Sequence, residues 1–146
     1  MSESATADAE TEAGRISARE LAKRGALAVG ASLLANWLLL GAVLAGNVVE
    51  PFDPLSFPPV TFLTAVGAVG ATLVYGGLTR LVSNPDRVFL LVAAVVLVLS
   101  FVPDVALLEV DPGATVPGVV VLMAMHVTVA VICVASLTDR YSPLSG

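Results

Sequence analysis

Long apolar runs alternate with short polar joints along the chain. Four stretches contain no Asp, Glu, Lys or Arg, and they cover residues 25–49, 54–79, 88–103 and 112–138. A helix that crosses the hydrocarbon of a bilayer needs about 20 mostly apolar residues. The third stretch is shorter, but it can begin near Pro85 when the side chain of Arg87 extends toward the interface. The pattern therefore predicts an all-α, polytopic integral membrane protein with a bundle of four transmembrane helices.

Capping residues mark where these helices begin. Ser17 and Glu20 have the spacing of a capping box, Asn84 precedes Pro85, and Thr115 can cap the last helix. The predicted membrane domain, residues 18–140, has helices at about 18–49, 59–82, 85–102 and 115–138. We expect the flanking residues, 1–17 and 141–146, to form cytoplasmic tails, and the acidic first tail to be disordered.

Two further expectations concern individual helices. The first apolar run is longer than the core of a signal peptide, so we expect it to remain as a helix. The third helix is expected to end, or to kink, at Pro103, because a proline inside a helix removes a backbone donor.

The positive charges predict the orientation of the bundle. All seven Lys and Arg residues lie before the first apolar run, between the second and third, or after the fourth: Arg15, Arg19, Lys23, Arg24, Arg80, Arg87 and Arg140. Basic loops remain on the cytoplasmic side of a membrane. We therefore expect a multi-pass protein of the cell membrane with both termini in the cytoplasm. On this topology the acidic residues of the outer side are Glu50, Asp53, Asp104, Glu109 and Asp111.

Composition narrows the functional classes. The chain is 57% hydrophobic and 13% charged, whereas soluble domains are roughly 45–50% apolar and about 25% charged. This excludes a soluble enzyme, and the net charge of −5 argues against binding to nucleic acid. The sequence has no phosphate-binding loop, nucleophile elbow or metal-ligand spacing. We therefore expect no enzymatic activity, no cofactor and no metal.

Three polar residues in or near the apolar spans form a candidate intramembrane polar site: Asn36, His126 and Asp104. Asn36 and His126 are expected at similar depth, where a hydrogen bond between them would contribute about 1 kcal/mol. The alternative is a proton or solute relay through His126. For Asp104, we expect a solvated residue at an interface turn, and the alternatives are the mouth of a polar cavity or a pair with His126.

Small residues suggest how the helices pack. Thr64, Ala68, Thr72 and Gly76 follow one another at four-residue spacing, which lets another helix backbone approach closely. We expect this stripe to pack within the bundle, with contact between copies of the chain as the alternative.

Several short segments carry a resemblance to a known family. VVLVLSFVPDVAL at 95–107, PGAT at 112–115 and VLMAMHV at 121–127 resemble small membrane proteins of domain-of-unknown-function family 6069. The resemblance runs from about Arg24 to Thr138. The resemblance implies a four-helix fold and a protein of the kind found in haloarchaea or actinobacteria. It implies no activity, because none is established for the family.

The function favoured by these observations is a structural or accessory role that depends on helix–helix contacts. The lipid bilayer and either a homo-oligomer or another membrane protein would be the partners. The alternative is a small transporter or channel subunit that uses Asn36 and His126. A continuous polar path through the bundle would favour transport, and a closely packed interior would favour the accessory role.

Overall fold

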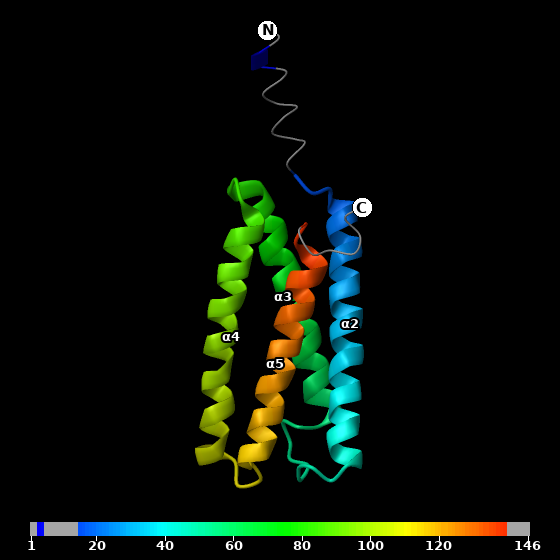
Figure 1. The fold of residues 1–146 in the computed structure, drawn as a ribbon, viewed down its shortest axis with the longest axis vertical. Coiled ribbons are helices and arrows are strands. Elements are labelled where there is room, and N and C mark those ends of the chain that lie inside the picture. Colours follow the sequence, from blue (N-terminus) through cyan, green and yellow to red (C-terminus); the bar gives the residue numbers. More distant parts are fainter. Residues whose placement is uncertain (1–2, 5–14, 140–146) are drawn as a thin grey trace.

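The protein is a bundle of four long helices. The computed structural model describes residues 3–4 and 15–139 (Figure 1), so most of both predicted tails lies outside the described residues. The helices are α2 (Ala18–Ala45), α3 (Phe57–Leu81), α4 (Pro85–Val110) and α5 (Val116–Leu137), and no strand occurs among the described residues. Each is long and apolar enough to cross a membrane. This confirms the prediction of an all-α, multi-pass membrane protein with four helices.

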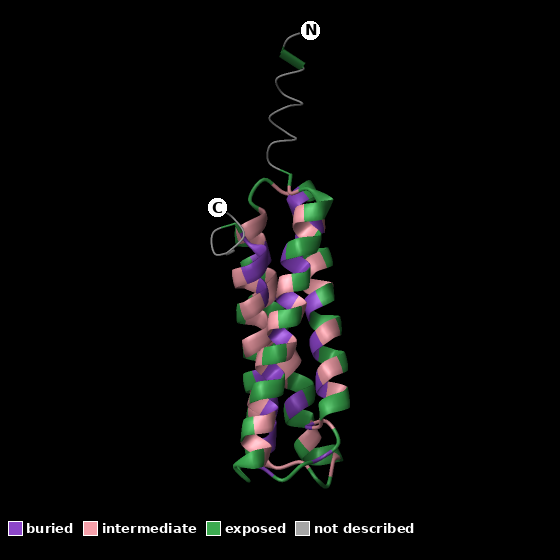
Figure 2. Ribbon diagram, turned by 90° about the vertical axis from the view of Figure 1, so that its right-hand side faces the viewer, coloured by how far each residue is buried: buried purple, intermediate pink, exposed green. Residues whose placement is uncertain are grey.

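The four helices do not contact one another equally. α2 packs against α3 and α5, whereas α4 packs mainly against α5 and less against α3; α2 and α4 do not touch. Figure 1 shows α3 joined to α4 by a short loop and leaning toward α2 at its other end. Buried residues follow the helix faces that meet inside the bundle, and exposed residues cover the outer faces (Figure 2). The bundle is therefore tight around α2 and loose around α4.

The predicted caps form at three helix starts. Ser17 Oγ accepts from the Glu20 amide at 3.1 Å, Asn84 Oδ1 from the Arg87 amide at 3.3 Å and Thr115 Oγ1 from the Gly118 amide at 3.2 Å. Each bond satisfies one of the amides that a helix start leaves without a partner.

Two helix ends differ from the prediction. α2 stops at Ala45 rather than at residue 49, and Asn47 adopts a positive φ of 50° just beyond it. The expected end of the third helix at residue 102 is wrong, because α4 continues through Pro103 to Val110. A helix satisfies backbone groups that hydrocarbon cannot, so continuing it outweighs the one hydrogen bond that a proline removes.

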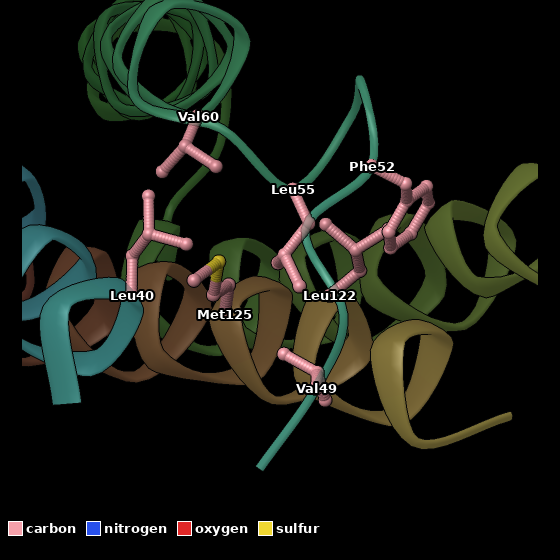
Figure 3. Packing of buried hydrophobic residues seen from close by; sticks show 7 residues of the cluster. All are labelled: Leu40, Val49, Phe52, Leu55, Val60, Leu122 and Met125. Carbon is pink, nitrogen blue, oxygen red and sulfur yellow. The ribbon is translucent and has the colours of Figure 1, made fainter. Parts of the chain in front are cut away.

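The α2–α3 connection, residues 46–56, folds back over its end of the bundle. Val49, Phe52 and Leu55 are buried there against residues of α2, α3 and α5 (Figure 3). A Cβ at Gly118 would lie 2.7 Å from the Phe52 ring, so only glycine allows this contact. A second core near the other end contains Tyr75 and Phe89, whose rings meet edge to face at 5.3 Å.

Small residues bring α2 and α3 together, as the stripe on α3 predicts. Thr64, Ala68 and Gly76 are buried along the inner face of α3. A Cβ at Gly25 of α2 would lie 2.6 Å from Thr72 Cγ2. The stripe therefore packs within the bundle.

Gly25→Ala is expected to destabilise the bundle by about 1–3 kcal/mol, because the added methyl overlaps the branched side chain of Thr72. Gly41→Ala on the same helix is the control, since its Cβ meets no atom within 4 Å. It should leave stability unchanged or raise it by about 0.5–1 kcal/mol through helix propensity. Thermal unfolding in detergent measures both, and equal stability of the two variants would contradict the close packing.

Candidate intramembrane polar site

Charged side chains divide the bundle into two ends. The described basic residues lie at one end, here called the basic end: Arg15, Arg19, Lys23, Arg24, Arg80 and Arg87. The other end, here called the acidic end, carries Glu50, Asp53, Glu109 and Asp111. Asp104 is the one acidic residue of the described chain that lies between these two ends.

A groove of about 690 Å³ is bordered by α3, α4 and α5. It extends along α3 from Val60 to Val74, a rise of about 21 Å at 1.5 Å per residue. Leu63 and Val66 on one wall and Val96 on the other are exposed, so the groove opens sideways toward lipid. Its lining is mainly apolar, with these polar exceptions: Asn36, Thr64, Ser100, Asp104, His126 and Cys133.

Asp104 and His126 meet inside this groove. His126 Nδ1 lies 2.9 Å from Asp104 Oδ2 and also 2.9 Å from the carbonyl oxygen of Leu122. A carbonyl can only accept, so the contact with Leu122 is a hydrogen bond in the tautomer that carries a hydrogen on Nδ1. Asp104 Oδ2 is buried beside the same nitrogen and has no aligned hydrogen-bond donor among the described residues. The close contact of the two side chains joins α4 to α5.

The expectation of a solvated Asp104 is wrong. Its side chain is 8% exposed, compared with 37% for His126. Because α4 remains helical through Pro103, it carries Asp104 onto the face that meets α5 rather than into a surface turn. Asp104 instead lies beside His126, which was the alternative expectation.

The predicted hydrogen bond between Asn36 and His126 does not form. Asn36 Nδ2 donates instead to Thr64 Oγ1 at 2.9 Å, because the small residues of α3 hold that helix close to α2. Asn36 Oδ1 is buried and has no hydrogen-bond partner among the described residues. All three residues of the predicted site nevertheless line the same groove.

A polar network at the basic end was not predicted. Arg24 is buried and donates to Glu20 Oε1 at 3.0 Å, to the Leu137 carbonyl at 3.0 Å and to Asp139 Oδ1 at 2.6 Å. It thereby connects α2 to the end of α5. The spacing of Glu20 and Arg24 could have indicated the first contact, but no local pattern indicates the contact with Asp139.

The Tyr75 hydroxyl adds a second connection near this end. It donates to Asp86 Oδ1 at 2.8 Å and so links α3 to the first turn of α4. The Asp139 amide also lies 3.4 Å from the same carboxylate oxygen. At the basic end, side-chain hydrogen bonds therefore hold the helices together in addition to apolar packing.

Comparison with known proteins places this arrangement in a family. The model of a family described as "Family of unknown function (DUF6069)" matches residues 16–143. The chain belongs to this family. The match includes all four helices and the three residues of the candidate site. Neither a curated protein nor a solved structure matches the chain.

His126→Leu should destabilise the bundle by about 1–3 kcal/mol, because it leaves the buried Asp104 carboxylate without its imidazole neighbour. Asp104→Leu in the same background should restore stability to within about 1 kcal/mol of the wild type, since replacing both partners removes the unpaired charge. Thermal unfolding in detergent compares the three proteins. A double variant no more stable than the single one would contradict a stabilising pair.

Proposed function

We propose that the protein is a non-catalytic accessory protein of the cell membrane that binds a second copy or another membrane protein through helix–helix contacts. The observation that carries this proposal is an outward-facing groove between α2 and α3, about 470 Å³ in volume. It is separate from the groove that contains the candidate polar site.

Small residues form the α2 wall of this groove. Ala22, Ala26 and Gly30 follow one another at four-residue spacing, and all three are exposed. A Cβ at Gly30 would meet no atom within 4 Å. In a membrane, helices associate through such small residues because their backbones can approach closely. Val69 and Leu73 of α3 are also exposed and form the opposite wall.

The distribution of polar residues supports binding over conduction. In the larger groove, Asn36, Thr64 and Asp104 lie toward the acidic end. Toward the basic end the described lining is apolar apart from the Cys133 thiol, with Val74 and Phe89 among its residues. A proton or ion would lack a continuous polar path through this part of the bundle, so the accessory role is favoured over a transporter or channel subunit.

We further propose that the basic end faces the cytoplasm, with both termini on that side. The described Lys and Arg residues all lie at this end, and Arg140 is outside the described residues. Short loops that carry basic residues stay on the cytoplasmic side during insertion.

Gly30→Leu should abolish association, because its side chain fills the α2–α3 groove without disturbing the bundle. Gly41→Leu is the matched control on the same helix, since it is equally unobstructed and lies outside that groove. Cross-linking in native membranes and the mass of the purified particle measure association. The wild type and the control should form the same assembly, and a monomer in all three proteins without a stoichiometric partner would contradict the proposal.

Asp53→Cys in the α2–α3 connection should react with a membrane-impermeant maleimide in intact cells. Ser83→Cys between α3 and α4 should react only after the membrane is opened. Both positions are exposed, whereas the native Cys133 is buried, so the wild type serves as the blank. The reverse labelling pattern would contradict the proposed orientation.

A further inference from the structure

The groove between α3, α4 and α5 contains two oxygen atoms that find no hydrogen-bond partner in the described part of the chain. Asp104 is 6% exposed and Asn36 is 2% exposed, and both line the groove. Asp104 Oδ2 and Asn36 Oδ1 have no hydrogen-bond partner among the described residues. We propose that this groove binds a lipophilic molecule with one long hydrocarbon chain and a hydroxyl group, whose hydroxyl donates a hydrogen bond to Asp104.

The chemistry of the unsatisfied atoms selects the hydroxyl group. A carboxylate oxygen and an amide oxygen are both acceptors, so the missing partner must be a donor. Leaving a buried acceptor unpaired costs about 1–3 kcal/mol, and hydrocarbon supplies no water to satisfy it. A hydroxyl that reaches either oxygen removes part of this cost.

His126 favours a hydroxyl over an ammonium group. Its Nδ1 lies 2.9 Å from Asp104 Oδ2, so a group that reaches this oxygen also lies beside the imidazole ring. A hydroxyl is both a donor and an acceptor, so it suits the ring whether the ring is neutral or protonated. An ammonium group has donors only, and beside a protonated ring it would place two positive charges together.

The remaining length of the groove fits a hydrocarbon chain. Its apolar part continues from the polar site toward Val74 and Phe89. Along α4, the distance from Asp104 to Phe89 is about 22 Å at 1.5 Å per residue, which exceeds the depth of one leaflet, about 15 Å. Gly67, Gly70 and Ala71 keep the α3 wall free of bulky side chains, and the sideways opening admits a molecule directly from the bilayer.

An apolar helix is a poorer occupant of the same groove. The outer helix faces of this chain present mainly Leu and Val, which cannot donate to Asp104 Oδ2 or Asn36 Oδ1. Covering the groove with such a face would exclude other donors and leave both oxygens unpaired. This proposal does not rest on the α2–α3 groove, so either can fail without the other.

A pair of ligands, one with a hydroxyl and one with that hydroxyl methylated, tests whether the donor is needed. The full-length protein in detergent is titrated with 1-hexadecanol and with 1-methoxyhexadecane, and binding is followed by native mass spectrometry. We expect one alcohol per protein and an affinity about tenfold higher than that of the ether, the effect of one hydrogen bond to a buried acceptor. Equal affinity for the ether and the alcohol would overturn the proposal.

Alcohols and alkylated hydroquinones share a hydroxyl on a hydrophobic tail, so a second arm distinguishes them. Decylbenzoquinone is added in its reduced form, which carries two hydroxyl donors, and in its oxidised form, which carries none. Tighter binding of the reduced form than of hexadecanol would assign an aromatic ligand, and the opposite order would assign an aliphatic one. Weaker binding of the oxidised form than of the reduced form supports a hydroxyl donor, and equal binding of the two forms would overturn the proposal.

Two variants locate the binding. Gly70→Leu fills the groove, and Gly77→Leu is its control, because a Cβ at either position meets no atom within 4 Å but only Gly70 lines the groove. Gly70→Leu should lose hexadecanol binding, whereas Gly77→Leu should retain it. Asp104→Leu should bind the alcohol no better than the ether.

The same variants also show which results would contradict the proposed ligand site. Wild-type affinity for hexadecanol in Gly70→Leu would overturn the proposal. The proposal would also be overturned if the wild type is a dimer, Gly70→Leu is a monomer and neither protein binds the alcohol. The groove would then be covered by a second copy of the chain. The unfolding temperatures of Gly70→Leu and Gly77→Leu are measured as well. If they agree, the two variants are compared as folded proteins.

Discussion

Hydrocarbon offers no hydrogen-bond partner to a protein, and this constraint governs most of the structure. Backbone groups are satisfied within four continuous helices, including the part of α4 beyond Pro103. Hydroxyl groups bond back to carbonyls of their own helices, as Thr72 does to Ala68 and Ser100 to Leu97. Buried Arg24 is compensated by three acceptors at the basic end. Among the described residues three buried side-chain oxygens are exceptions, Ser32 Oγ, Asn36 Oδ1 and Asp104 Oδ2. Asn36 and Asp104 line the groove between α3, α4 and α5, so this groove contains two acceptors that remain free to bind a donor.

Packing follows from where small residues occur. Gly25 and Gly76 let α2 and α3 approach until a Cβ would collide, so this pair of helices is close. α4 consists mainly of Val, Leu and Ala and has no glycine, and among its residues only Phe89 and Asp104 are buried. A groove opens on the side where this close packing is missing. Glycines that face the partner helix therefore close the α2–α3 side of the bundle, whereas α4, which has no glycine, leaves the side of α3 and α5 that faces it open to lipid.

Apolar run length and capping residues were sufficient to predict the helices and most of their starts. They could not predict the third helix end, because the hydrogen bond lost at Pro103 is a local cost, whereas the gain from continuing the helix is spread over the backbone groups up to Val110. For the candidate site, hydropathy predicted that Asn36 and His126 lie within the span. The rotation of each helix decides which neighbour a side chain meets, and this depends on packing over the whole bundle. Thr64 was therefore missed as the partner of Asn36, and Asp139 as a partner of Arg24.

The weak attachment of α4 has a mechanical consequence. The bundle consists of a compact body, α2, α3 and α5, and one helix that lies against it with little buried surface. Tilting that helix exposes few buried side chains, so the lipid that contacts its outer face helps to set its position. The Asp104–His126 pair lies where α4 meets the body. The thickness and lateral pressure of the bilayer thus become part of what determines the width of the groove.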